Sequence, residues 1–290
     1  MPANGGPPND DRRRGGESGP GGERGPGGES GPGSDTLPAP RDASQAAGLK
    51  ARIAAGEGLG AVWLSLGHAA IAEIAARSAP DLLVLDLQHG LFDRLGMETA
   101  IGLARDLPVM VRVAENRAAL IGEALDAGAA GVIVPLIDTS ADAASAVAAA
   151  HYPPIGIRSA GGVRPLAAFG SYLAGAQNRT AVVAMIETAT GLANAAAIAA
   201  TPGLDMVFIG TGDLAVSLGC APGDAAHESA CADVLAACQA AQRPCGLFTM
   251  SVAAARQRRA QGYALTVLAS DMALIGDGVA AAKAGFADAG

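Results

Sequence analysis

Two carboxylates follow closely on short apolar runs in the second half of the chain. Glu187 comes directly after Ala181–Ile186, and Asp213 comes shortly after Met206–Ile209. Mg²⁺ is usually held by one or two carboxylates, with the remaining positions open to water and substrate. The pair is therefore a candidate site for a hard divalent cation. Each residue taken alone could instead be a helix N-cap, which is a common position for an acid after a strand.

A basic side chain and a set of backbone donors accompany the two acids. Arg112 lies within the apolar run Val109–Val113, where a charge is costly unless it meets an anion or a carboxylate. Gly210–Asp213 reads GTGD and opens a predicted helix, so its free N–H groups can receive a carboxylate or a phosphate. With a metal, these groups suit an α-keto acid that chelates it through its carboxylate and keto oxygens. A structural ion pair is the alternative for Arg112.

Two further residues are candidates for proton transfer. His89 follows the run Leu82–Leu87 and could act as a general acid or base, with an ordinary core or surface histidine as the equal alternative. The other histidines, His68, His151 and His227, have no comparable setting. Asp126 lies near a predicted helix C-terminus, where the helix dipole disfavours an acid. A satisfied turn aspartate explains it, and so would a role in orienting another group.

The elements that must position these residues are short, buried strands. From Leu49 onward, apolar runs alternate with alanine-rich stretches of helical period. Several runs are apolar at consecutive positions, as strands buried on both faces are. The runs are Ala61–Leu66, Leu82–Leu87, Val109–Val113, Gly131–Leu136, Ala181–Ile186, Met206–Ile209, Cys245–Phe248 and Leu265–Leu268.

The stretches between these runs predict helices with ordinary stop signals. They include 69–78, 117–127, 141–150, 191–199, 228–241 and 252–261. Eight alternations of strand and helix within about 240 residues favour a fold of the α/β class, a (β/α)8 TIM barrel. Chemistry in this fold gathers at the carboxyl ends of the strands, where the candidate residues stand. A dinucleotide-binding sheet lacks its main signature here, because no G-x-G-x-x-G follows the first strand.

Two segments fall outside the regular alternation. Residues 1–40 hold 12 of the 40 glycines and 8 of the 17 prolines, and residues 15–32 repeat one hexad three times. We expect residues 1–45 to be a disordered Gly/Pro/Glu-rich tail, since such a segment buries too little apolar surface to offset its ordering entropy, and 46–290 to be the barrel domain. The long connection Tyr152–Asn178 could be a lid, a subunit contact or a plain surface excursion.

The overall composition excludes several classes of protein. A formal net charge of −8 argues against a nucleic-acid partner. No apolar run approaches the length of a membrane span, and the N-terminus has no secretory pattern. The four cysteines form no C-x-x-C pair, which predicts reduced thiols in a cytoplasmic protein. Only two lysines are present, Lys50 and Lys283.

Six motifs along the chain form a specific pattern when their order and spacing are taken together. They are Asp86-x-x-His89, Arg112, Leu125-Asp126-x-Gly128, Tyr152-Pro-Pro-x-Gly156-x-Arg158, Ile186-Glu187-Thr188 and Phe208-Ile-Gly-x-x-Asp213-Leu214. From about Leu49 to Ala284, the chain resembles the metal-dependent pyruvate aldolases of the HpcH/HpaI aldolase/citrate lyase family. The resemblance implies an eightfold barrel that assembles as a homo-oligomer, a hexamer or trimer, through its C-terminal helices.

The resemblance also implies roles for the charged residues. Glu187 and Asp213 are similar to the ligands of a divalent cation, Mg²⁺ or Mn²⁺, with Co²⁺ as a further candidate. Arg112 resembles the group that holds the pyruvate oxygen and stabilises the enolate charge. His89 resembles the catalytic acid and base, with Asp126 as its orienting partner.

For the substrate shell, the resemblance carries over less completely. The backbone of Gly212 and Asp213 is expected to receive the pyruvate carboxylate, and Trp63 resembles an aromatic wall of the site. Met185 stands where well-studied members carry a glutamine, Gln88 stands where they carry a glutamate, and GTGD replaces a Gly-Pro-Ala-Asp turn. The metal site therefore looks intact, whereas the groups around the substrate are altered.

We therefore predict a class II aldolase that cleaves a 4-hydroxy-2-oxo acid reversibly into pyruvate and an aldehyde. A Schiff-base mechanism needs a lysine on a barrel strand, and neither Lys50 nor Lys283 falls on one. One alternative is a lyase for CoA thioesters of the malyl or citramalyl type, although such enzymes generally carry more basic residues for the nucleotide. The other is a non-catalytic oligomeric barrel, against which the joint presence of the charged residues argues.

Overall fold

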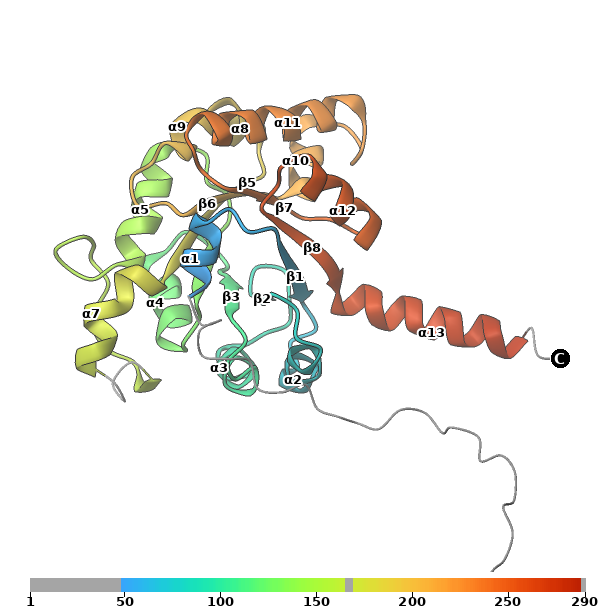
Figure 1. Cartoon of the computed structure of the whole chain (residues 1–290), viewed down its shortest axis with the longest axis horizontal. Helices are drawn as coiled ribbons and strands as arrows, with labels where there is room; N and C mark the ends of the chain where they lie inside the picture. The colour runs from blue at the N-terminus through green and yellow to red at the C-terminus, as the bar shows by residue number, and fades with distance from the viewer. Residues whose placement is uncertain (1–47, 165–168, 288–290) are drawn as a thin grey trace, which may run out of the picture. The chain divides into compact units, whose positions relative to one another are not determined.

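The structure, a computed structural model, describes residues 48–164 and 169–287. Eight parallel strands close into a barrel in chain order, with helices around the outside (Figure 1). The strands are β1 (Leu59–Leu64), β2 (Leu82–Asp86), β3 (Val109–Arg112), β4 (Gly131–Val134), β5 (Ala181–Ile186), β6 (Met206–Ile209), β7 (Cys245–Leu247) and β8 (Leu265–Ser270). The predicted (β/α)8 barrel is confirmed, and the predicted tail 1–45 lies outside the described residues.

Helices connect successive strands, and several begin at a side-chain cap. Thr139 and Asp142 form a capping box at the start of α5 (Ser140–Ala150), and Thr188 and Ser251 cap α8 (Ala189–Ala193) and α12 (Val252–Ala260). The helices are α1 (Leu49–Ala54), α2 (Ala69–Arg77), α3 (Arg94–Leu103), α4 (Ala118–Asp126), α5 (Ser140–Ala150), α7 (Phe169–Arg179), α8 (Ala189–Ala193), α9 (Ala195–Ala199), α10 (Thr211–Leu218), α11 (Ala225–Ala240), α12 (Val252–Ala260) and α13 (Asp271–Ala287).

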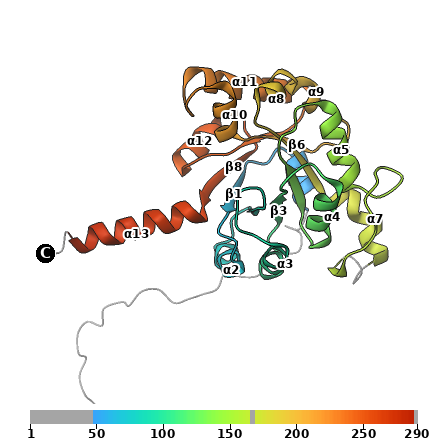
Figure 2. The same ribbon diagram turned by 180° about the vertical axis from the view of Figure 1, so that it is seen from behind.

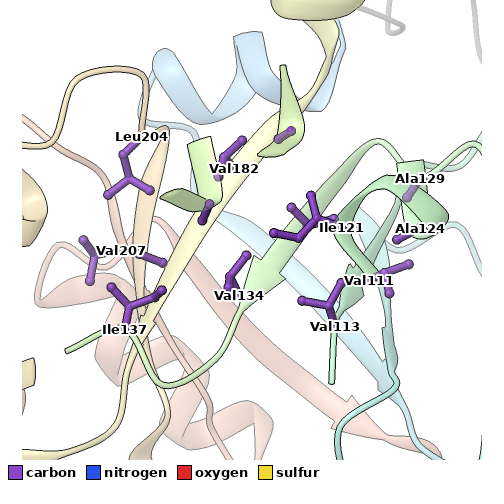
Figure 3. Close-up of a cluster of buried hydrophobic side chains, with 14 of the residues drawn as sticks. Val111, Val113, Ile121, Ala124, Ala129, Val134, Ile137, Val182, Leu204 and Val207 are labelled. Carbon is purple, nitrogen blue, oxygen red and sulfur yellow. The ribbon is translucent and has the colours of Figure 1, made fainter. Parts of the chain in front are cut away.

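The core has two layers because side chains alternate across each strand. On β3, Val111 faces outward into the cluster between strands and helices that Figure 3 shows, with Ile121 of α4 and Val182 of β5. Met110, next along β3, belongs instead to the cluster that fills the barrel interior. This period of two decides which residues near the strand ends face the barrel axis.

Helix α1 closes the amino end of the barrel. Its apolar residues Leu49 and Ile53 belong to the interior cluster. Its basic residues reach acids that stand just before strands: Lys50 lies 3.2 Å from Asp205, and Arg52 lies 2.7 Å from Asp81. One of the two lysines is thus engaged at the end of the barrel opposite to the candidate site.

The described residues of the long connection after α5 also lie toward the amino end. The N–H of Ile157 donates to the carbonyl of Ala148 at 2.8 Å, near the end of α5. Arg158 is buried and donates to Asp126 at 2.7 Å, at the end of α4. The residues of the connection that the structure describes, which include α7, therefore do not cover the carboxyl end of the barrel.

Helix α13 extends away from the barrel in both views (Figures 1 and 2). Asp271 is its buried residue, and its carboxylate accepts the N–H groups of Ser65, Leu66 and Met272. Large apolar side chains on α13 are exposed: Met272, Leu274, Ile275, Val279 and Phe286. Within the described residues, no helix has the length and apolar character needed to cross a membrane.

Candidate active site

The alternation along each strand brings the candidate residues to the barrel axis. Val183 and Met185 of β5 fill the interior, so Glu187, two residues further, faces the same way. In the same way, Met110 of β3 and Val84 of β2 face the interior. Arg112 and Asp86, each two residues further along the same strand, therefore face it as well. The carboxyl end of the barrel therefore collects charge directly above an apolar core.

Asp86 and Arg112 form a buried, two-point ion pair. They are register partners on neighbouring strands. Nε of Arg112 donates to Oδ1 of Asp86 at 2.9 Å, and Nη2 donates to Oδ2 at 2.5 Å. Burial raises the pKa of Asp86, but the hydrogen bonds and charge of Arg112 outweigh it and hold that pKa below its usual value. Arg112 thus has the structural carboxylate that the sequence left open as its alternative partner.

Other groups converge on the same carboxylate. The backbone N–H groups of Gln88 and His89 donate to Oδ1 of Asp86 at 3.0 and 3.2 Å. Nε1 of Trp63 donates to Oδ2 at 3.3 Å, and the guanidinium of Arg112 lies 5.1 Å from the Trp63 ring centroid. Nη1 of Arg112 is not used by Asp86 and lies 4.0 Å from Sδ of Met185. The edge of the guanidinium formed by Nε and Nη2 is therefore fixed by Asp86, whereas Nη1 has only the long contact to Met185 and can donate to another partner.

Glu187 lies in a different electrostatic setting. Its side chain is buried, and Oε1 accepts the N–H of Leu136 at 2.8 Å. Oε2 is also buried, and among the described residues it has no hydrogen-bond partner. Burial, followed by the nearby carboxylate of Asp213, raises the pKa of Glu187 to about 7, against the N–H of Leu136 and the charge of Arg112. A buried carboxylate beside a second acid is a site that a cation would stabilise.

The donor set tests whether a metal ion fits. Within the described part of the chain, no group of three or more His, Cys, Asp or Glu side chains could hold a metal ion. The pair Glu187 and Asp213 supplies two carboxylates only, which is the number that Mg²⁺ commonly takes from protein when water and substrate complete its shell. The unpartnered Oε2 of Glu187 is the atom that this arrangement requires. The residues present fit a hard divalent cation.

Two backbone positions bring Glu187 into place. A Cβ atom on Gly210 would lie 2.5 Å from Oε2 of Glu187, so only glycine permits this approach. Leu136 has φ of 54°, in the left-handed region that disfavours residues other than glycine. In this conformation its N–H points at Glu187, while its side chain is half exposed. Strain of this kind often marks functional sites.

The turn that follows β6 faces open space. Gly210 is the N-cap of α10 without a side-chain cap, and Asp213 is the third residue of the helix. A Cβ atom on Gly212 would meet no atom within 4 Å. Thr188, rather than Glu187, caps α8 through its Oγ1. Neither acid is therefore an N-cap, and the free N–H groups at the start of α10 lie next to the metal candidate.

The remaining predicted residues are distributed differently. His89 is exposed at the carboxyl end, three residues after Asp86 in the chain. Asp126 stands shortly before β4, at the amino end, where Arg158 binds it. Within a single chain, Asp126 and His89 therefore lie at opposite ends of the barrel. Trp63 is buried beneath Arg112, with its ring centroid 6.0 Å from that of Phe208, and it contacts protein groups rather than lining an open wall.

The sequence patterns assign no role to Asp86 or Leu136, and they do not connect Gly210 with Glu187. The signal for Asp86 is present, because it continues the inward series of Leu82 and Val84 at the last position of β2. The signals for Leu136 and Gly210 are tertiary, since both depend on how close the backbone comes to Glu187.

Comparisons with known proteins show which proteins the chain resembles. Residues 60–277 match the sequence model of the HpcH/HpaI aldolase/citrate lyase family. The chain is 38% identical over 233 residues to a 4-hydroxy-2-oxovalerate aldolase of Rhodococcus jostii, covering 78% of this chain and 90% of that protein. It is 39% identical over 235 residues to a hydroxypyruvate/pyruvate aldolase of Rhizorhabdus wittichii, covering 78% and 92%. A crystal structure of a protein of the same family from Burkholderia cenocepacia superposes with a TM-score of 0.78 at 35% identity, covering 82% of this chain and 98% of that one.

Proposed function

The chain belongs to the HpcH/HpaI aldolase/citrate lyase family, and from this premise we propose that Glu187, Asp213 and Arg112 form the centre of its active site. It is an enzyme, a carbon–carbon lyase that cleaves a 4-hydroxy-2-oxo acid reversibly into pyruvate and an aldehyde. One observation supports the proposed site above all. Oε2 of Glu187 is buried close to a second acid, Asp213, and it has no hydrogen-bond partner among the described residues.

Glu187 and Asp213 would hold a divalent cation, Mg²⁺ or Mn²⁺. When bound, such a cation supplies Lewis-acid polarisation of a keto oxygen. The two lysines support this class of chemistry, because Lys50 is engaged by Asp205 at the amino end and Lys283 is exposed on α13. Neither reaches the carboxyl end of the barrel, so a Schiff base with the substrate has no lysine to form on.

The chain's own groups perform the remaining work. The N–H groups of Gly212 and Asp213 receive the carboxylate of the oxo acid at the start of α10. Nη1 of Arg112 donates to the keto oxygen and stabilises the negative charge that develops there as the enolate forms. Because Asp86 already fixes the guanidinium at two points, Arg112 needs no reorientation when that charge appears.

His89 is the proposed proton carrier. In cleavage, it accepts the proton of the C4 hydroxyl while the C3–C4 bond breaks. The electron pair of that bond passes to the enolate of pyruvate, and the aldehyde is released. His89 then passes that proton on to C3, which completes pyruvate, and the same steps run in reverse for addition.

The proposed assembly is a homo-oligomer, a hexamer or trimer, in which α13 packs on another copy of the chain. A helix of 17 residues with one buried residue and five exposed large apolar side chains is unstable against water unless a partner covers it. Light scattering is expected to give the mass of an oligomer, and Leu274→Glu together with Ile275→Glu should lower that mass. A monomeric wild-type chain would contradict the assembly.

The decisive test of the site is exchange of the pyruvate methyl protons for deuterium, followed by NMR. It detects enolate formation without any choice of aldehyde. We expect exchange with Mg²⁺ or Mn²⁺, its loss with a chelator, and a fall of more than about 100-fold in Glu187→Gln. Calorimetric titration with Mn²⁺ should show weaker binding in the same variant.

Glu123→Gln on α4 is the matched control, because it removes an acid of the same type far from the carboxyl end. It should keep both exchange and Mn²⁺ affinity. Undiminished exchange in Glu187→Gln would refute the proposed site.

A further inference from the structure

The start of α10 is braced from behind by a residue outside the proposed site. His227 lies in the first turn of α11 and is buried. Its Nε2 lies 3.0 Å from the carbonyl oxygen of Thr211, the first residue of α10. On the opposite side, Oγ1 of Thr211 donates to the carbonyl of Phe248 at 3.2 Å. Thr211 is thus held by two elements, α11 and the end of β7.

The contacts of His227 define its tautomer. The backbone N–H of Gly223 donates to Nδ1 at 3.2 Å, and a backbone N–H can only donate, so Nδ1 carries no hydrogen. The carbonyl of Thr211 can only accept, so Nε2 carries the hydrogen. Both ring nitrogens are therefore engaged, Nδ1 as an acceptor and Nε2 as a donor. The ring joins α11, the connection between α10 and α11, and the first turn of α10.

Other groups near the ring do not replace these contacts. Oε1 of Glu228 lies 3.9 Å from Nδ1, but Arg258 binds that carboxylate at two points, 2.7 and 2.5 Å. Sγ of Cys231 lies 3.8 Å from Nε2, longer than the bond to Thr211. His227 is thus aimed at the backbone of α10 rather than at a charged partner.

The turn that His227 braces has few anchors of its own. Gly210 provides no side-chain cap, and a side chain on Gly212 would touch nothing within 4 Å. Thr211 is the residue of this turn whose side chain and carbonyl contact the rest of the protein. Its position sets where the N–H groups of Gly212 and Asp213 point.

We propose that His227 is a positioning residue for the carboxylate-binding turn of α10. The inference rests on the proposed function, because it assigns the oxo-acid carboxylate and Asp213 to this turn. The turn contacts the carboxylate equally in the ground state and in the transition state. Loss of the brace should therefore raise KM for the oxo acid and weaken metal binding, with little change in kcat.

Two substitutions separate the ring nitrogens. In His227→Gln, the amide N–H reaches the position of Nε2 and can still donate to Thr211. In His227→Asn, the amide oxygen reaches the position of Nδ1 and can still accept from Gly223, whereas Thr211 loses its donor. Each variant retains one contact of the two, so each should lose a similar amount of thermal stability.

We expect His227→Asn to raise KM for pyruvate in the deuterium-exchange reaction about 5- to 10-fold and to weaken Mn²⁺ binding by a similar factor. His227→Gln should remain within about 3-fold of wild type in both measurements. Thr211→Val, which removes the bond to Phe248 from the other side, should shift KM in the same direction as His227→Asn. This variant tests the brace even if His227→Asn does not fold.

The proposal is overturned if His227→Asn and His227→Gln show equal KM and equal Mn²⁺ affinity, or if kcat falls while KM stays constant. Failure of the proposed function looks different, since wild type would then exchange no pyruvate protons with any divalent metal. In that case, Mn²⁺ titrations of His227→Asn and His227→Gln still test whether the contact between His227 and Thr211 positions the start of α10.

Discussion

The two ends of the barrel carry the same kind of side chain in opposite circumstances. At the amino end, Asp81 stands just before β2 and Asp205 just before β6. Each accepts a backbone N–H from a neighbouring strand, of Gly60 at 2.9 Å and of Val182 at 2.8 Å, and each binds a basic residue of α1. At the carboxyl end, Glu187 has one oxygen bound by a backbone N–H and another without a partner in the described chain.

This difference separates acids that stabilise the fold from acids that strain it. Charge at the amino end is compensated within the chain, so metal or substrate should add nothing there. At the carboxyl end, Glu187 is desolvated beside Asp213, and in the proposed site a bound cation would compensate its charge. Asp86 lies between these cases, because it stands at the carboxyl end yet is fully bound by Arg112, Trp63 and backbone groups.

The largest combined loss of stability and of pyruvate exchange is expected from a substitution of Asp86. Asp86→Asn leaves Arg112 buried without its carboxylate, and breaking a buried pair from one side typically costs about 3–5 kcal/mol. Pyruvate exchange should also fall by about 100-fold, because the guanidinium loses its fixed orientation. Urea unfolding and NMR exchange measure the two losses.

A double variant sharpens this prediction. Asp86→Asn with Arg112→Met removes both charges and should regain part of the lost stability without regaining exchange. If the single variant kept wild-type stability, the ion pair would not be the support that its geometry indicates.

A smaller and one-sided effect is expected at Asp205. Asp205→Asn removes the charge that Lys50 contacts at 3.2 Å and weakens the acceptor for Val182, so the free energy of unfolding should fall by about 1–3 kcal/mol. The value of kcat should stay within about 2-fold of wild type, because the residue lies at the other end of the barrel. A large loss of kcat in the folded variant would contradict the view that acids at the amino end serve only stability.

The sequence predicts much of the barrel and part of the site, for separate reasons. Strands buried on both faces are apolar at consecutive positions, so β2, β5 and β6 are visible as runs that begin where the structure begins them. Glu187 and Asp213 follow such runs, and strand direction alone puts them at one end. The sequence indicates that Asp86 and Arg112 both face inward, but it does not indicate that they pair, because pairing depends on the register of β2 and β3.

Asp126 is a candidate residue whose place in the barrel its motif alone does not reveal. Its motif suggests a role beside His89, but a helix that follows a strand of the barrel returns to the amino end, and Asp126 ends such a helix. Its neighbour there is Arg158, from the connection after α5. The described residues of the long connection 152–178 are on that side for the same reason, since α5 ends at the amino end before the connection starts.

Leu136 carries a consequence for how this chain would respond to laboratory evolution. A left-handed residue other than glycine costs about 1–2 kcal/mol, and glycine would remove that cost while keeping the N–H that binds Glu187. A library selected for heat resistance alone should enrich glycine at this position, and one selected for turnover should do so only if the half-exposed leucine side chain is dispensable. The frequency of one substitution under the two regimes thus becomes a direct measure of how far catalysis and robustness compete at the mouth of the barrel.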